Sequence, residues 1–236
     1  MHRSLGARMS LRVVCCYSLL TGPDGWQDSH RCVRQFVNAL KSRPLSGYGY
    51  VRLFPDSPRL RIDGSNAHEA VDWFGAMATD ILQRELPGTA PVLVPVPDSR
   101  RITTSPASQT RPLAEAISSR IAGSTVLDVL CFDQVMHSAH GAQGARDALS
   151  LHLHLKLRGP LLSGRPYVLV DDVVTTGGHL AAARALLRQH GAEVLMAVCA
   201  ASADRTPAID PFERVVRTIV DYVPRSVDVS SRCSPT

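Results

Sequence analysis

The stretch that decides the fold is Tyr167-Val168-Leu169-Val170-Asp171-Asp172-Val173-Val174-Thr175-Thr176-Gly177-Gly178-His179-Leu180. An apolar run typical of a buried parallel strand ends in two carboxylates, and a short loop of hydroxyls and glycines then leads into a helix. In an open α/β sheet, ligands bind beyond the carboxyl ends of the strands. The stretch therefore predicts a ligand site at the end of this strand.

The loop from Thr175 to His179 predicts an anion site. Backbone N–H groups and the positive end of a helix dipole converge there, and adjacent glycines allow a close approach to the backbone. Asp171 and Asp172 would repel a phosphate, but they suit hydroxyl groups or a metal ion a few ångströms away. A ribose 5-phosphate, with a phosphate at one end and a diol in the middle, meets both requirements.

An alternative is an ordinary strand-to-helix turn in which Asp172 or Thr175 caps the helix. A cap accounts for one polar residue, but not for two acids at the end of a buried strand followed by Thr-Thr-Gly-Gly. The stretch also lacks the Gly-Lys-Ser/Thr element of a Walker A loop and the G-x-G-x-x-G pattern of dinucleotide-binding folds. The pattern therefore favours the ribose-phosphate interpretation.

Outward from this stretch, apolar strands alternate with amphipathic helices from residue 91 onward. This alternation predicts an α/β fold, a parallel sheet with helices on both faces. The expected strands are 91–96, 125–132, 151–157, 166–170, 192–201 and 215–223, and the expected helices are 108–122 and 178–190. Upstream we expect a strand over 11–20, helices over 29–41 and 66–86, and a hairpin of 48–54 with 59–62.

The strand over 151–157 is predicted from a strict alternation, Leu-His-Leu-His-Leu-Lys-Leu, which places His152 and His154 on one solvated face. Two histidines without a third ligand favour a wet strand face over a metal site. The chain as a whole divides into an N-terminal α+β extension or hood (residues 1–90), a core (91–223) and a polar C-terminal tail (224–236).

Composition limits the class of protein. The chain has 236 residues, of which 44% are hydrophobic and 20% charged, as in globular proteins. No apolar run approaches the roughly 20 residues that a membrane helix needs. The net charge is +5, but the basic residues are scattered arginines apart from Lys41 and Lys156, so charge alone does not predict nucleic-acid binding. Six cysteines without a C-x-x-C pair argue against a zinc ribbon and for a reduced, cytoplasmic protein.

Val168–His179 resembles the phosphoribosyl pyrophosphate (PRPP) motif of type I phosphoribosyltransferases. The resemblance implies the type I phosphoribosyltransferase fold, with Asp171 and Asp172 holding the ribose 2′- and 3′-hydroxyls. It also implies that the loop wraps the 5′-phosphate, and the implied substrate-binding residues here are Val173, Val174, Thr175, Thr176, Gly177, Gly178 and His179. These loops usually end in Ser or Thr where this chain has His179. Many purine-salvage members carry an acid at the position of Thr175, which argues against that subgroup.

Val92–Arg101 resembles the Pro-Val-Pro strand end of the ComF-like (competence protein F) branch, where the segment forms the pyrophosphate loop. The implied pyrophosphate contacts are Asp98, Ser99, Arg100 and Arg101, and the planar guanidinium fork suits phosphate oxygens. The alternative for the arginine pair is a solvated loop. Ser105–Gln109 stands in place of the branch's Arg-Gly-Phe-Asn-Gln, and the amino-terminal zinc ribbon of many members is not found. The resemblance covers roughly residues 91–201.

Residues 133–150 lie where the family has its flexible catalytic loop. Arg146 is the best candidate to reach pyrophosphate, so we predict a catalytic role for it with Asp171 and Asp172. His137, His140 and Gln143 are weaker candidates, and an ordinary surface loop is the alternative. The implied cofactor is Mg²⁺, which the two aspartates would hold indirectly, through ribose oxygens and waters.

These implications predict a PRPP-dependent phosphoribosyltransferase, a glycosyltransferase of nucleotide metabolism. It would transfer ribose 5-phosphate to a nitrogenous, nucleobase-like acceptor and release pyrophosphate. Two alternatives stay open: a non-catalytic regulator that binds PRPP or a nucleotide, and a ComF-like DNA-uptake accessory. The expected partners are PRPP and an unidentified small-molecule acceptor. No membrane partner is expected, a nucleic acid is not predicted although it stays open, and a homodimer is compatible with the sequence.

Overall fold

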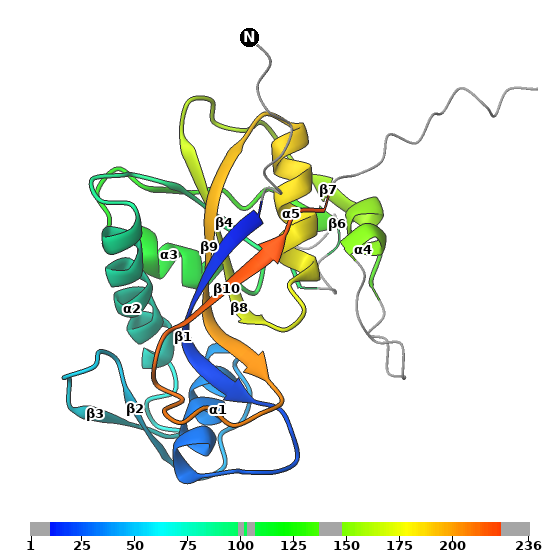
Figure 1. The fold of residues 1–236 in the computed structure, drawn as a ribbon. Helices are drawn as coiled ribbons and strands as arrows, with labels where there is room; N and C mark the ends of the chain where they lie inside the picture. Colours follow the sequence, from blue (N-terminus) through cyan, green and yellow to red (C-terminus); the bar gives the residue numbers. More distant parts are fainter. Residues whose placement is uncertain (1–9, 99–101, 103–106, 137–147, 223–236) are drawn as a thin grey trace, which may run out of the picture.

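The computed structural model describes residues 10–98, 102, 107–136 and 148–222 (Figure 1). Its centre is a six-stranded sheet made of β1 (Ser10–Leu20), β4 (Val92–Pro95), β5 (Thr125–Val126), β8 (Pro166–Val174), β9 (Glu193–Asp204) and β10 (Val215–Val220). The spatial order is β10-β1-β9-β8-β4-β5. All neighbours are parallel except β10, which runs antiparallel to β1 at one edge.

Helices cover both faces of this sheet. They are α1 (Asp28–Leu40), α2 (Glu69–Glu85), α3 (Arg111–Ser118), α4 (Ala148–His154) and α5 (Gly178–Gln189). One apolar layer packs α1, α2 and α3 on one face, and a second layer packs α4 and α5 on the other. Figure 1 shows α2 and α3 on one side of the sheet and α5 on the other. The predicted α/β class, a mostly parallel sheet flanked by helices, is confirmed.

The N-terminal part of the chain contributes to the sheet as well as to the region beyond it. β1 lies inside the sheet, between β10 and β9. α1 and the hairpin of β2 (Gly49–Arg52) and β3 (Arg59–Ile62) lie past the carboxyl ends of β1 and β9, at the bottom of Figure 1. From here on, the word hood means these three elements only, and not the whole of residues 1–90. Tyr17 of β1, fully buried, packs edge-on against Phe36 of α1 with ring centroids 5.3 Å apart and so holds the hood on the sheet.

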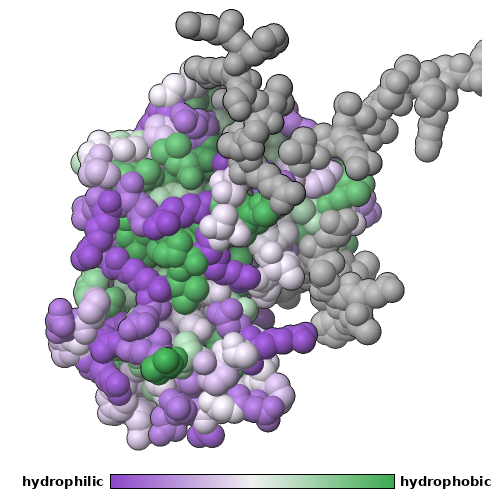
Figure 2. All heavy atoms as spheres, viewed as in Figure 1, coloured by the Kyte–Doolittle hydropathy of each residue, from purple (hydrophilic) through white to green (hydrophobic). Residues whose placement is uncertain are grey.

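The surface seen in Figure 2 is largely hydrophilic, with apolar side chains gathered between α2 and the strands. A cavity of 550 Å³ lies between α2, the β2–β3 hairpin and the segment before β10, with Cys16, Met77 and Phe212 among its lining residues. No helix of the described residues is long and apolar enough to cross a membrane.

The predicted single strand over 151–157 is wrong. Residues 148–154 form α4, and only β7 (Leu155–Leu157) is extended, paired with β6 (Leu130–Phe132). Within α4, Leu151 is buried, whereas Leu149 and Leu153 are 44% and 54% exposed. Leu149 and Leu153 are four residues apart and so share one helix face, and a strict alternation of leucines contains that spacing as well as the spacing of a strand.

His152 and His154 consequently do not share a strand face. The His152 ring packs against Tyr222 with centroids 5.4 Å apart, whereas His154 Nδ1 lies 3.0 Å from Asp133 Oδ1. Within the described ranges, no group of three or more His, Cys, Asp or Glu side chains could hold a metal ion.

The predicted strand over 125–132 divides into β5 and β6, which belong to different sheets. The Leu127 N–H donates to the Leu93 carbonyl at 2.9 Å, and at the next residue the Asp128 carboxylate accepts the Ser108 N–H at 3.0 Å. The chain leaves the central sheet after Leu127, where the Asp128 carboxylate contacts the segment that precedes α3.

Candidate functional site

The end of β8 organises the candidate site. β8 runs four residues beyond its predicted end at Val170, since β9 continues to pair with it as far as Val174. Asp171 and Asp172 are therefore the last polar residues within the strand, and both are half-buried. Their carboxylates lie at the carboxyl edge of the central sheet, where ligands bind in open α/β folds.

The two carboxylates have different surroundings. Asp172 faces α1, and its Oδ2 lies 2.9 Å from Nζ of Lys41, which follows the last residue of that helix. The Asp171 Oδ1 accepts a hydrogen bond from the backbone N–H of Asp172 at 2.8 Å. Burial raises the pKa of Asp171 well above its usual value and the charges of Asp172 and Asp98 raise it further, whereas the Asp172 N–H and Lys41 lower it.

The segment after β4 is fixed at the same edge. The Val96 N–H donates to the Val170 carbonyl at 2.9 Å, and the Val96 carbonyl accepts from the buried hydroxyl of Thr110 at 2.7 Å. The structure thus brings Asp98 close enough to Asp171 for its charge to act there. The other predicted pyrophosphate contacts lie outside the described residues, namely Ser99, Arg100, Arg101, His137, His140, Gln143 and Arg146.

The loop between β8 and α5 ends in a left-handed glycine. Gly177 has φ of 84° and is the N-cap of α5, without a side-chain cap hydrogen bond. The side-chain contact at this end is long, 3.5 Å between the Gly178 N and the Thr176 Oγ1. Neither Asp172 nor Thr175 caps the helix, so the capping alternative is wrong. The first N–H groups of a helix lack intrahelical partners and, with the helix dipole, attract an anion.

A cavity of 330 Å³, which we call the loop cavity, opens beside this loop. It is lined by Ala148, Thr176, Gly177, Gly178, Ala181, Arg217, Thr218, Ile219 and Val220. Arg217 of β10 donates to the Thr175 carbonyl at 2.7 Å, which ties the loop to the edge strand and places a guanidinium beside it. Sequence reasoning missed Arg217, because nothing in the pattern distinguishes it from the other scattered arginines.

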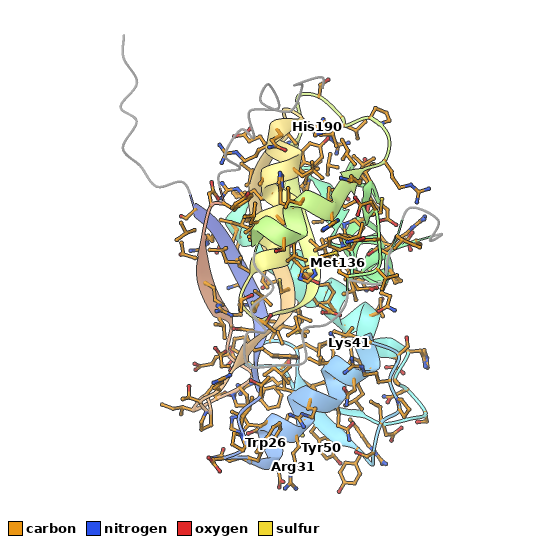
Figure 3. All side chains as sticks on the ribbon, turned by 90° about the vertical axis from the view of Figure 1, so that its right-hand side faces the viewer. Trp26, Arg31, Lys41, Tyr50, Met136 and His190 are labelled. Carbon is orange, nitrogen blue, oxygen red and sulfur yellow. The ribbon has the colours of Figure 1, made fainter. Side chains whose placement is uncertain are left out.

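A second cavity, of 370 Å³, lies between the end of β8 and the hood, and we call it the hood cavity. It is lined by Leu19, Thr21, Arg34, Val37, Asn38, Lys41, Arg43, Val173, Thr175 and Ala203. Figure 3 shows Lys41 at the upper end of α1, toward the sheet, and Trp26 and Arg31 at its far end. Sequence reasoning missed Lys41 too, although it is one of only two lysines in an arginine-rich chain.

The remaining predicted site residues lie in different surroundings: the core, one of the two cavities, or a contact with an aromatic ring. Val174 is 2% exposed, so its side chain belongs to the core rather than to either cavity. Thr176 is exposed and lines the loop cavity, whereas Thr175 lines the hood cavity. The His179 ring packs edge-on against Phe132 of β6, with centroids 6.0 Å apart.

Residues 75–231 match the family model of the phosphoribosyl transferase domain. The chain is 33% identical over 98 residues to a uracil phosphoribosyltransferase of Corynebacterium urealyticum, covering 30% of this chain and 45% of that protein. It is 50% identical over 50 residues to an orotate phosphoribosyltransferase of a Nocardioides species, covering 21% of this chain and 27% of that protein. The chain therefore spans less than half the length of either relative.

Among solved structures, the chain is similar to adenine phosphoribosyltransferase of Saccharomyces cerevisiae. The two share 15% identity, with a TM-score of 0.38, over 72% of this chain and 89% of that one. The family match begins inside α2, so β4, β8, α5 and β10 fall within it and α1 with the β2–β3 hairpin does not.

Proposed function

Because this chain belongs to the phosphoribosyl transferase domain family, we propose that it transfers the ribose 5-phosphate of PRPP to a nitrogenous acceptor and releases pyrophosphate. The proposal depends mainly on one observation: two carboxylates, Asp171 and Asp172, and the N-terminus of α5, with Gly177 as its N-cap, lie at the same edge of the sheet. A ribose 5-phosphate carries both a diol, which suits the carboxylates, and a phosphate, which suits the helix N-terminus.

In this proposal the backbone N–H groups of Thr175–His179 hold the 5′-phosphate at the loop cavity, and Arg217 supplies a neighbouring positive charge. The ribose hydroxyls donate hydrogen bonds to Asp171 and Asp172. The carboxylates then also lie near the anomeric carbon, where positive charge develops in the transition state.

The reaction breaks the bond between C1′ and the pyrophosphate oxygen, and pyrophosphate leaves with the electron pair. A nitrogen of the acceptor forms the new bond to C1′ and loses its proton to solvent. The protein contributes positioning, charge neutralisation and the exclusion of water. Asp98, Ser99, Arg100, Arg101 and Arg146 are the proposed contacts of the leaving pyrophosphate.

The residues present fit a magnesium ion held mainly by substrate. Mg²⁺ in phosphate-transferring sites keeps several waters and takes one or two carboxylates together with phosphate oxygens. Asp171 and Asp172 would hold it through ribose oxygens and waters, and they lie at the edge where PRPP is proposed to bind. When bound, the ion would neutralise charge on the pyrophosphate.

We place the acceptor in the hood cavity, which shares Val173 and Thr175 with the end of β8. Its charged lining residues are all cationic, Arg34, Lys41 and Arg43, and of these Lys41 pairs with Asp172. Such a lining favours an acceptor ring that carries a carboxylate or another negative charge. Of the bases named in the relatives above, orotate carries a carboxylate, whereas uracil and adenine do not.

Pyrophosphate release tests the proposed activity. With PRPP and Mg²⁺ present, we expect release to depend on an acceptor, and among orotate, uracil and adenine we expect orotate to be the most effective. Release with none of the acceptors tried, together with saturable PRPP binding, would contradict an enzyme and favour a PRPP-binding regulator.

Replacing Arg43 tests the placement of the acceptor. The variant Arg43→Met should raise the KM for an anionic acceptor about 10- to 100-fold, the range expected for one hydrogen bond to a charged group, and leave the KM for PRPP unchanged. Arg31→Met is the matched control, because Arg31 is an exposed arginine of α1 that does not line the hood cavity. Equal effects of the two variants would place the acceptor elsewhere.

Replacing Lys41 tests the electrostatic coupling between the hood and β8. Lys41 lowers the pKa of Asp171, so its loss should raise that pKa further. If the ionised carboxylates accept hydrogen bonds from ribose, the midpoint of the pH dependence of PRPP binding should move to higher pH in Lys41→Met. Lys41→Arg keeps the charge and should keep the wild-type midpoint. An unchanged midpoint in both variants would contradict the coupling.

The ComF-like branch is suggested by Val92–Arg101 alone. A cytoplasmic location is supported by five free cysteines among the described residues, of which four are buried.

A further inference from the structure

The positive charge of the chain is concentrated in the hood. The segment from Asp28 to Ile62, which contains the hood and its connecting loops, has seven lysines and arginines and two acids, a net charge of +5. The whole chain also has a net charge of +5, so the remaining residues, with nineteen basic and nineteen acidic side chains, are neutral together. Arginines that are scattered along the sequence are therefore gathered in one part of the structure, which attracts anionic partners.

A groove of 750 Å³, which we call the α1 groove, lies in this part of the surface, between α1 and β2. Figure 3 shows two of its lining residues, Arg31 and Tyr50, at the end of the hood opposite Lys41. No residue of β8 or of the loop after it lines the groove, and the family match begins only at residue 75. The α1 groove therefore lies outside the matched domain and apart from the carboxylates of β8. Its charged lining residues are Arg31, Arg34, Arg59 and one acid, Asp28.

Two arginines of the groove are held by aromatic rings and not by carboxylates. The guanidinium carbon of Arg34 lies 4.0 Å from the ring centroid of Trp26, and that of Arg59 lies 5.8 Å from the ring centroid of Phe212. The ion pairs among the described residues include neither Arg34 nor Arg59. Both guanidinium groups are thus positioned and still uncompensated, and their planar geometry suits carboxylate oxygens.

A buried amide on the wall of the groove lacks one hydrogen-bond partner. Gln35 of α1 is 8% exposed, and its Nε2 donates to the Ser46 carbonyl, which fixes the orientation of the amide. The Gln35 Oε1 is buried and accepts no hydrogen bond from the described residues. Because a buried acceptor without a partner is costly, an N–H donor within the groove would be stabilised there.

Two exposed tyrosines stand beside the groove, but they do not form a platform for stacked bases. Tyr48 and Tyr50 are 61% and 43% exposed, and their rings meet edge-on with centroids 5.7 Å apart. The guanidinium of Arg61 also lies over the ring of Tyr48, at 5.0 Å. Single-stranded nucleic acids stack successive bases on open aromatic faces, which these rings do not present. Tyrosine and arginine are, in contrast, the side chains most enriched at protein–protein interfaces.

We propose that the α1 groove binds an extended, acidic peptide segment of a partner protein. Carboxylates of the segment pair with Arg31, Arg34 and Arg59, and one of its backbone N–H groups donates to the Gln35 Oε1. The segment is extended because a helix satisfies its own backbone N–H groups internally. The groove is mostly polar and open to solvent, so the association is weak and falls as salt rises. The proposal does not depend on the transfer reaction, so the two can fail separately.

Fluorescence anisotropy of a labelled peptide rich in Asp and Glu, titrated with the full chain, tests the proposal. We expect saturable binding that weakens as salt rises, and weaker binding of a labelled oligo-dT strand. Arg59→Glu reverses one charge of the groove and should weaken peptide binding at least about tenfold. Arg111→Glu is the matched control, because Arg111 is an exposed arginine of α3 outside the groove, and it should leave the affinity unchanged.

Gln35→Met tests the contact with the peptide backbone. It removes Oε1 without adding a charge and should weaken binding about 2- to 12-fold, the range for one neutral hydrogen bond. Thr79→Val is its control, because Thr79 of α2 also has a buried oxygen without a partner but does not line the groove. Arg59 is exposed, so its variant remains a test even if Gln35→Met fails to fold.

Three outcomes would each overturn the proposal. They are no saturable binding of the acidic peptide, equal affinities of Arg59→Glu and Arg111→Glu, and oligo-dT that binds as tightly as the peptide. A folded Gln35→Met variant that binds the peptide as well as Thr79→Val would overturn the extended mode of binding.

Discussion

Replacing both Asp171 and Asp172 with asparagine is expected to remove PRPP binding while the protein stays folded. Each carboxylate is proposed to accept a hydrogen bond from a ribose hydroxyl. Hydrogen bonds to charged groups contribute about 1.5–3 kcal/mol each, so the loss of two corresponds to roughly a 100- to 20,000-fold weaker affinity. Isothermal titration of PRPP with Mg²⁺ measures the change, and unchanged affinity would show that the carboxylate pair has another role.

The same carboxylates allow a test of stability against pH. Burial, and then the charge of Asp172, raise the pKa of Asp171 in the folded protein. Because the pKa of Asp171 is higher in the folded than in the unfolded protein, its contribution to the free energy of unfolding is greatest below the unfolded-state pKa. That stability is lost as the pH rises through the folded-state pKa. At neutral pH, which lies above the unfolded-state pKa of an aspartate, Asp171 therefore lowers the stability of the wild type.

The variant Asp171→Asn should accordingly unfold at the same or a higher temperature than the wild type at pH 7, while binding PRPP more weakly. The difference in unfolding temperature between this variant and the wild type should become smaller as the pH falls below the folded-state pKa of Asp171. Thermal unfolding at several pH values measures both trends. A variant that is less stable than the wild type at pH 7 would contradict the assignment of Asp171 as a buried, functionally retained carboxylate.

The second large effect is expected from Gly177→Ala. Gly177 has φ of 84°, which side chains rarely adopt, and an added Cβ would lie 2.3 Å from Cδ1 of Ile219. The left-handed conformation alone costs about 1–2 kcal/mol for a residue with a side chain. The close contact also forces either the loop or β10 to move. We expect PRPP affinity to fall by at least about tenfold, because the N–H groups of the loop no longer converge.

Gly164→Ala is the matched control for this variant. Gly164 also has a positive φ, 70°, but an added Cβ there meets no atom within 4 Å, and its turn lies at the opposite end of β8 from the loop. It should lower the unfolding temperature and leave PRPP affinity unchanged. Adding Ile219→Val to Gly177→Ala removes Cδ1 and should recover part of the lost affinity. Equal losses of PRPP affinity in both glycine variants would contradict a specific role for the loop.

Local patterns in the sequence were sufficient to predict a mostly parallel sheet flanked by helices and to propose a candidate site at the end of one strand. The apolar run of β8, the acids that end it and the glycines after it lie within fourteen consecutive residues, so their chemistry can be interpreted from spacing alone. The same holds for α1, α2, α3 and α5, whose periodic apolar faces predict them within a few residues of their ends.

The remaining features depend on contacts between distant parts of the chain. Lys41 and Arg217 reach the site from α1 and β10, and no local pattern links either residue to Asp172 or to Thr175. The insertion of β1 between β9 and β10 depends on strand pairing across nearly the whole sequence. The α4 segment was mispredicted because alternating leucines satisfy the spacing of a helix as well as that of a strand.

A crystal structure of the protein with PRPP and Mg²⁺ tests the proposed PRPP site most directly. We expect the 5′-phosphate within hydrogen-bond distance of the backbone N–H groups of Thr175–His179, and the ribose hydroxyls on Asp171 and Asp172. PRPP bound elsewhere, with its phosphate away from this loop and its ribose away from these carboxylates, would contradict it.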